Sequence, residues 1–275
     1  MRGILVYERQ TAAERKWYID RYLKGFEAEG IEFDLCYDCD CLKRAEDGEI
    51  DFAIMRKIDP SLNKSLEDRK VRVFNSARLS ETANDKGKSY ELADILQIPS
   101  LGYTALGSAG RDMEFPMVAK SVDGHGGTEV FLIEDEAALK ALKNGADAGR
   151  YILQPLCDEP GIDMRVYVIG GRIIAAMRRE NKNLREGDSP LRERFKSNFC
   201  LGGRAEAIEP PEYVREYAET LCGFLPMDFA GIDFIRHKGR WIFNEIEDVV
   251  GARMLYSYTD MDVVSLYIKY ICSQL

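Results

Sequence analysis

Three acidic side chains near the end of the chain have the spacing of a metal-ligand set. Glu245 and Glu247 stand two residues apart in an apolar stretch, so in a β-strand both side chains leave the same face. Asp233 lies in the preceding apolar stretch, and Lys238-Gly239 between the two predicts a tight hairpin turn. If the turn comprises residues 238–240, Asp233 lies directly across from Glu245, whereas a slip of one residue separates them.

Carboxylates gathered on one face of a hairpin repel one another unless a cation joins them. Oxygen ligands without histidine or cysteine suit Mg²⁺, with Mn²⁺ as a second candidate. The alternative, which this stretch alone leaves open, is a half-solvated hairpin whose outer face is acidic.

The elements expected to position these residues form an α/β (α+β) chain. Apolar strands at 2–7, 31–37, 52–58 and 71–75 alternate with helices or long connections, which predicts a small, mostly parallel sheet. A helix over 80–97, a strand over 115–120 and a strand over 151–156 follow. The second half is mostly strands, with Gly170-Gly171 marking a hairpin between 164–169 and 172–177.

Composition excludes several classes of partner. The net charge of −9 over 275 residues argues against a nucleic-acid backbone as the main partner. No apolar run approaches the roughly 20 residues of a membrane helix. Seven cysteines without an export signal lead us to expect a reducing cytoplasm. Cys36, Cys39 and Cys41 lack a fourth zinc ligand at the usual spacing, so we expect free, partly buried thiols.

Several further residues could bind an anion. Lys120 ends an apolar strand, and the glycine-rich stretch DGHGG follows it with Gly124, Gly126 and Gly127, whose backbone N–H groups can surround a phosphate. Lys86 is a second candidate. Taken singly, each lysine is better explained as a solvated charge, and the glycines as an ordinary turn. Arg56 follows a buried strand, where ligands bind in open α/β sheets, although a surface arginine is the alternative.

The order of these features resembles the ATP-grasp superfamily, and within it the RimK-like carboxylate–amine ligases. The resemblance covers nearly the whole chain: Asp85-Lys86, FPMVAK, DGHGG, YILQPL, GIDMRVYVIGG, SNFCLGG and the acidic hairpin occur in the family's order, after Asn75-Ser76 at the turn into the connecting helix. It implies an ATP-grasp fold with a pre-ATP-grasp domain at 1–78, a central or lid subdomain at 79–158 with the flap, and a C-terminal subdomain at 159–275.

The resemblance also implies roles for individual residues, and a homo-oligomer would be ordinary for the family. The nucleotide-binding set would be Lys86, Lys120, Gly124, Gly126, Gly127, Gln154, Leu156, Glu159 and Asp163, with Glu159 or Asp163 near the ribose. The catalytic set would be Arg165, Arg178 and Asn198, and the metal ligands Asp233, Glu245 and Glu247. The family usually has asparagine where this chain has Glu247, so we expect tighter or additional metal binding, or a neighbouring cation such as Arg253.

The implied activity is ATP-dependent amide or peptide bond formation through an acyl phosphate with Mg-ATP. Arginines at Arg9, Arg56, 178–204 and Arg253 favour an acidic substrate such as glutamate or a peptide carboxylate. Two alternatives stay open: a phosphotransferase that stops at phosphoryl transfer, and a nucleotide-binding module without turnover.

Overall fold

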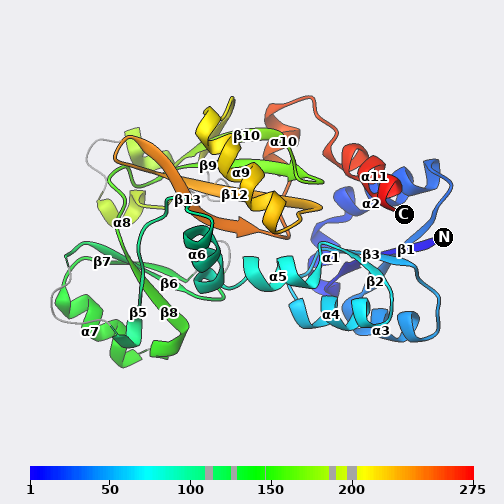
Figure 1. Cartoon of the computed structure of the whole chain (residues 1–275), viewed down its shortest axis with the longest axis horizontal. Helices are drawn as coiled ribbons and strands as arrows, with labels where there is room; N and C mark the ends of the chain where they lie inside the picture. Colours follow the sequence, from blue (N-terminus) through cyan, green and yellow to red (C-terminus); the bar gives the residue numbers. More distant parts are fainter. Residues whose placement is uncertain (109–113, 125–128, 146, 186–189, 197–202) are drawn as a thin grey trace.

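The computed structural model describes residues 1–108, 114–124, 129–145, 147–185, 190–196 and 203–275. Within these residues the strands form three sheets, which the chain enters one after another (Figure 1). The sheets span residues 2–74, 104–155 and 162–247, each inside one of the three predicted segments, and the division into domains stays a prediction. No described helix has the length and apolarity that a membrane crossing needs.

The first sheet is parallel, as predicted, with the order β2-β1-β3-β4. Its strands are β1 (Arg2–Tyr7), β2 (Glu32–Tyr37), β3 (Phe52–Met55) and β4 (Arg72–Phe74). Its helices are α1 (Arg9–Glu14), α2 (Lys16–Ala28), α3 (Asp38–Glu46) and α4 (Pro60–Asp68). Helix α2 packs on one face and α3 and α4 on the other, so apolar residues alternate into both cores along β1 and β3. Cys36, Cys39 and Cys41 are free thiols, and Cys36 and Cys41 are buried.

Two short helices, α5 (Ala77–Ala83) and α6 (Lys86–Ile95), replace the single helix expected over 80–97. That expectation was wrong because Asp85 adopts an extended backbone and its side chain accepts a hydrogen bond from the Lys88 N–H, 3.0 Å away, as an N-cap. The new start makes Lys86 the first residue of α6. Lys86 is consequently held at the point where α6 meets the second sheet.

The second sheet is antiparallel with the order β5-β8-β6-β7. Its strands are β5 (Thr104–Ala105), β6 (Met117–Ser121), β7 (Val130–Ile133) and β8 (Tyr151–Pro155). Helix α7 (Glu136–Gly145) and the 3₁₀ turns η1 (Leu106–Ser108) and η2 (Ala148–Arg150) accompany it. The side chains beneath it form a small buried cluster of their own.

The third sheet is antiparallel with the order β11-β10-β9-β12-β13. Its strands are β9 (Ile162–Ile169), β10 (Arg172–Glu180), β11 (Arg204–Ile208), β12 (Phe229–His237) and β13 (Arg240–Glu247). The predicted two-residue turn is confirmed: Gly170 and Gly171 join β9 to β10 with φ of +57° and +73°, which glycine adopts without strain. The short elements η3 (Lys182–Arg185) and α8 (Leu191–Arg194) follow β10.

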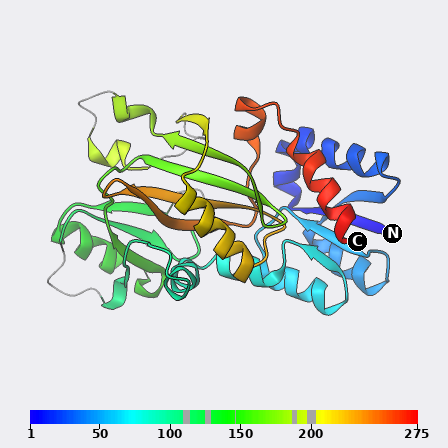
Figure 2. The same cartoon turned by 45° about the horizontal axis from the view of Figure 1, so that its top comes forward.

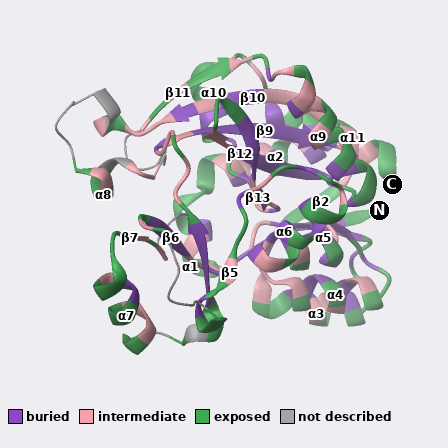
Figure 3. Ribbon diagram, turned by 60° about the vertical axis from the view of Figure 1, so that its left-hand side comes forward, coloured by how far each residue is buried: buried purple, intermediate pink, exposed green. Residues whose placement is uncertain are grey.

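Helix α9 (Glu212–Phe224) lies across one face of the third sheet (Figure 2). The central strands β9 and β12 are buried almost throughout (Figure 3). Helices α10 (Arg253–Tyr258) and α11 (Val263–Gln274) end the chain, and α11 packs beside α2. The opposite face of the sheet from α9 is therefore covered only in part, and it carries the acidic residues.

A buried asparagine joins the first sheet to the third. The Asn75 Nδ2 donates to the carbonyl oxygens of Phe229 and Asp248, both at 2.7 Å. Its Oδ1 accepts from the backbone N–H groups of Asp228 at 2.8 Å and Phe229 at 3.0 Å. Four hydrogen bonds satisfy both ends of the amide, so Asn75 sets the position of β12 relative to the first sheet.

Candidate functional site

The hairpin that carries the acidic residues has a two-residue turn and a bulge further along its second strand. His237 pairs with Arg240, so the turn is the two residues Lys238 and Gly239, both at positive φ. This confirms the tight turn predicted at Lys238-Gly239, whereas the three-residue turn over 238–240 is not formed. The register then shifts by one residue, and Asp233 pairs with Glu245, which confirms the predicted pairing.

The extra residue in this bulge is Asn244. Phe234 pairs with Phe243, and the next pair along is Asp233 with Glu245, so Asn244 has no partner of its own on β12. Phe243 is fully buried in the core beneath the sheet, whereas Asn244 and Glu245 both line the cavity on the other face. Strict alternation from Phe243 would send Glu245 into the core. The bulge therefore brings Glu245 to the site.

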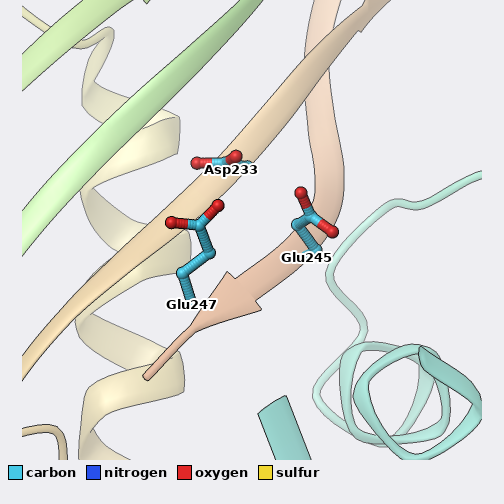
Figure 4. Close-up of side chains that lie close together, drawn as sticks. All are labelled: Asp233, Glu245 and Glu247. Carbon is cyan, nitrogen blue, oxygen red and sulfur yellow. The ribbon is translucent and has the colours of Figure 1, made fainter. Parts of the chain in front are cut away.

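Asp233, Glu245 and Glu247 converge at this end of the sheet (Figure 4). One carboxylate oxygen from each lies within 4.8 Å of the others. Oxygen ligands on opposite sides of Mg²⁺ are about 4.2 Å apart, since each bond is about 2.1 Å, so a small side-chain movement closes the set around the ion. Three carboxylates and no softer donor fit a hard divalent cation.

Two buried arginines surround Asp233. Arg165 donates from Nε to Asp233 Oδ1 at 2.7 Å and from Nη2 to Oδ2 at 2.6 Å, and Arg179 Nη2 donates to the same Oδ2 at 2.6 Å. Burial by itself raises the pKa of Asp233, but the two guanidinium groups outweigh it and hold that pKa at about 2. Asp233 is 1 % exposed, and its charge is retained there because both arginines compensate it.

Adjacent arginines on β10 have different partners. Arg179 is buried and also pairs with Asp163 through two hydrogen bonds. Arg178 pairs instead with Glu206, 2.9 Å away on β11, and with Glu180. Neighbouring residues in a strand face opposite ways, so only one of the two arginines can reach the acidic face. Arg179 therefore takes the place in this cluster that the sequence analysis assigned to Arg178.

Glu247 has a cationic partner, but it is not Arg253. Arg165 Nη2 donates to Glu247 Oε1, while Arg253 is exposed. Burial raises the pKa of Glu247 above its usual range, and although Arg165 opposes this, the charges of Asp233 and Glu245 add to it. Glu247 is the extra carboxylate relative to the family pattern. Arg165 stabilises its negative charge, whereas Asp233 and Glu245 repel it.

The predicted lysines lie on the opposite wall, from α6 and the second sheet. Lys120 Nζ donates to Asn244 Oδ1 at 2.8 Å and to the Tyr90 hydroxyl at 3.1 Å, and Tyr90 in turn donates to Gln154 Oε1 at 3.0 Å. Lys86 Nζ donates to the carbonyl oxygen of Gly124, and burial lowers the pKa of Lys86. Neither lysine lies within 4.0 Å of a carboxylate oxygen in the described part of the chain.

These residues line one cavity of about 990 Å³ that extends to the first sheet. The predicted residues on its wall are Lys86, Lys120, Gly124, Gln154, Leu156, Asp163, Arg165, Asp233, Glu245 and Glu247. Glu159 is not on that wall and accepts a hydrogen bond from Arg236 Nε at 3.1 Å. The predicted residues Gly126, Gly127 and Asn198 lie outside the described residues.

Sequence reasoning missed Arg179 and Tyr90. The strand alternation that places Arg165 and Asp163 on one face of β9 would have identified Arg179, because Arg179 pairs with Asp163 across the β9–β10 ladder. Tyr90 gave no such signal, since its role depends on the contact of α6 with β8 and β13. Asn244 both accepts a hydrogen bond from Lys120 and forms the bulge in β13.

Comparison with known proteins agrees with this architecture. The profile of the RimK-like ATP-grasp domain matches residues 108–271. The chain is 27% identical over 223 residues to the uncharacterized protein MG011 of Mycoplasma genitalium, covering 80% of this chain and 72% of that one. It is 26% identical over 221 residues to a probable alpha-L-glutamate ligase of Methanococcoides burtonii, covering 77% and 70%. The crystal structure of D-cycloserine synthetase DcsG superposes with a TM-score of 0.73 at 18% identity, covering 100% and 99% of the two chains, which shows a shared fold.

Proposed function

Because this chain belongs to the RimK-like ATP-grasp family and is an ATP-dependent carboxylate–amine ligase, we propose that the 990 Å³ cavity is its ligase site. The observation that carries this assignment is the division of charge across the cavity. Carboxylates and arginines of the third sheet form one wall, and lysines without a described acidic partner form the other. A cavity between two walls of this kind fits a polyanion accompanied by a divalent cation.

The lysine wall is proposed to bind ATP. Lys86 and Lys120 now donate to neutral oxygens, a carbonyl, an amide and a hydroxyl, so their charges are available to phosphate oxygens. Gln154 is 1 % exposed and is fixed by Tyr90 and the Leu101 carbonyl oxygen, 3.0 Å away. The backbone at the end of β8 and at Leu156, which line the cavity, is proposed to face the adenine.

The acidic wall is proposed to bind Mg²⁺ through Asp233, Glu245 and Glu247, with Mn²⁺ able to replace it. When bound, the ion supplies charge neutralisation on the β- and γ-phosphate oxygens. Arg165 and Arg179 lie on the same face of the sheet as these carboxylates. Their N–H groups can donate to the transferring phosphoryl group and to the acyl phosphate. Each is held in place by hydrogen bonds to a carboxylate.

The chemistry needs no nucleophilic side chain. A substrate carboxylate oxygen attacks the γ-phosphorus, and the bond to the β,γ-bridging oxygen breaks, which yields ADP and an acyl phosphate. The amine of the second substrate then attacks the acyl carbon, loses a proton and displaces inorganic phosphate. Both steps pass through anionic states, which the arginines and lysines of the cavity stabilise.

The substrates are small molecules or peptides, and we propose glutamate or a peptide carboxylate among them. Two features support this choice. The Methanococcoides burtonii relative is named a probable alpha-L-glutamate ligase. The cavity also continues past the acidic wall toward the arginines Arg15, Arg56 and Arg253, which suit an acidic substrate.

Glu245→Gln tests the assignment, because Glu245 forms no ion pair within 4.0 Å with the described residues. We expect phosphate release with Mg-ATP and a panel of amino-acid and peptide pairs to fall at least about 100-fold, the scale of losing one charge stabiliser. Glu216→Gln, on the exposed side of α9, is the matched control and should retain the wild-type rate.

Normal turnover by Glu245→Gln would show that the metal assignment is wrong. Formation of a stable phosphate ester without any amine would indicate a phosphotransferase, and an absence of ADP release with every pair would indicate a binding module. Amide product that appears only when an amine is supplied is the result expected for a ligase.

A further inference from the structure

A second arginine site lies in the same cavity, at the carboxyl end of the first sheet. Arg56 follows the last residue of β3, and its backbone N–H donates to the Val6 carbonyl oxygen at 2.9 Å. Its side chain lines the cavity together with Tyr18. Ligands of open parallel sheets bind at this end of the strands, because the loops there surround an open crevice.

The Arg56 guanidinium is held in place but has no counter-charge. Nη2 donates to the Val250 carbonyl oxygen at 3.0 Å, and the guanidinium carbon lies 5.4 Å from the centre of the Tyr18 ring. Nε is buried without a hydrogen-bond partner, and so is the Tyr18 hydroxyl. In the described part of the chain no carboxylate oxygen lies within 4.0 Å of this group.

An arrangement of this kind is costly without a ligand. A buried cation normally pairs with an anion, and a buried N–H or O–H without a partner costs free energy. Arg165 and Arg179 in the same cavity each pair with a carboxylate, whereas Arg56 forms no such pair with the described residues. The guanidinium of Arg56 therefore lines the cavity as a cation without a carboxylate partner among the described residues.

The position of Arg56 relative to the acidic wall limits the size of that ligand. Val250, which accepts from Arg56, is three residues after Glu247. Three residues span at most about 11 Å even when fully extended. A molecule of amino-acid or dipeptide size can therefore reach from the carboxylates that we assign to the metal to the guanidinium of Arg56.

We propose that Arg56 binds a free carboxylate of the substrate that is not the one joined in the reaction. The site thereby selects substrates that keep a negative charge next to the bond being formed, such as a dicarboxylic amino acid. This inference rests on the proposed function for the location of the reacting carboxylate, but the binding of an anion at Arg56 can be measured without turnover.

The test compares wild type with Arg56→Gln by calorimetric titration in the presence of Mg²⁺ and a non-hydrolysable ATP analogue. The probes are L-glutamate and its two monoamides, L-glutamine and L-isoglutamine, which each remove one carboxylate. Arg56→Gln should weaken L-glutamate binding by about 10- to 100-fold, the range for a hydrogen bond to a charged group. Arg56→Lys should recover part of the loss, since it restores charge without the planar fork.

The two monoamides identify which carboxylate Arg56 holds. The monoamide that lacks this group should bind wild type about as weakly as L-glutamate binds Arg56→Gln, and the substitution should change its affinity little. The other monoamide should lose affinity in Arg56→Gln as L-glutamate does. Arg215→Gln, which removes an arginine paired with exposed Glu209 outside the cavity, should leave every affinity unchanged.

Three results would each overturn the proposal: an equal loss of affinity for both monoamides on going from wild type to Arg56→Gln, an unchanged affinity of L-glutamate in Arg56→Gln, or no saturable binding of L-glutamate to wild type. Binding of the ATP analogue should be the same in wild type and Arg56→Gln, which separates a local effect from a folding defect. If L-glutamate binds through Arg56 but no amide forms with any amine, the proposed function fails while this inference stands.

Discussion

Arg178 and Arg179 form a natural pair for testing the site, because they are adjacent in sequence and differ in what they contact. In Arg179→Gln, the two hydrogen bonds from Arg179 to Asp163 are lost, and so is the one to Asp233. Asp163 is 6 % exposed, so the ion pair that is lost is a buried one. Removing one partner of a buried ion pair costs about 3–5 kcal/mol of unfolding free energy.

Arg178→Gln breaks contacts with Glu206 and Glu180 in a setting where the arginine side chain is 30 % exposed and Glu206 is 60 % exposed. Water screens such pairs, and their loss costs about 0–1 kcal/mol. Urea unfolding followed by circular dichroism gives the difference directly. We also expect phosphate release to fall only in Arg179→Gln. Equal destabilisation of the two variants, or a larger loss of activity in Arg178→Gln, would refute the strand-face reasoning.

Three further outcomes follow from the contacts described. Asn75→Ala should lower the unfolding free energy by about 2–5 kcal/mol, because four hydrogen bonds between the first and third sheets are lost, and urea unfolding measures it. Lys120→Met should weaken binding of a fluorescent ATP analogue about 10-fold, whereas Lys88→Met, which removes an exposed lysine paired with Glu81, should not. Chelation with EDTA should abolish phosphate release by wild type and excess Mg²⁺ should restore it; activity that survives chelation would contradict the metal site.

Much of the architecture was predictable from the chain because local signals agree with the global fold. The apolar runs of β1 and β3, buried on both faces, indicated a parallel sheet, and Gly170-Gly171 located the β9–β10 turn. The types of the acidic residues and their two-residue spacing indicated a metal site. These features depend on residues close together in sequence, or on their order along the chain.

Other features of the site were decided only by tertiary packing. The Asp233–Glu245 pairing was expected from a three-residue turn, but it arises from a two-residue turn and a bulge, because Phe243 is drawn into the core while Asn244 bonds to Lys120. Neither contact is visible in the hairpin sequence.

The same holds for the arginines. Sequence alone determined that the chain supplies arginines near its acidic hairpin, but not which of them would meet a carboxylate. Arg179 rather than Arg178 faces Asp233, Arg165 rather than Arg253 pairs with Glu247, and Arg56 stays without a described carboxylate partner. A long charged side chain is directed by the charges and the space around it, and residues distant in sequence supply both.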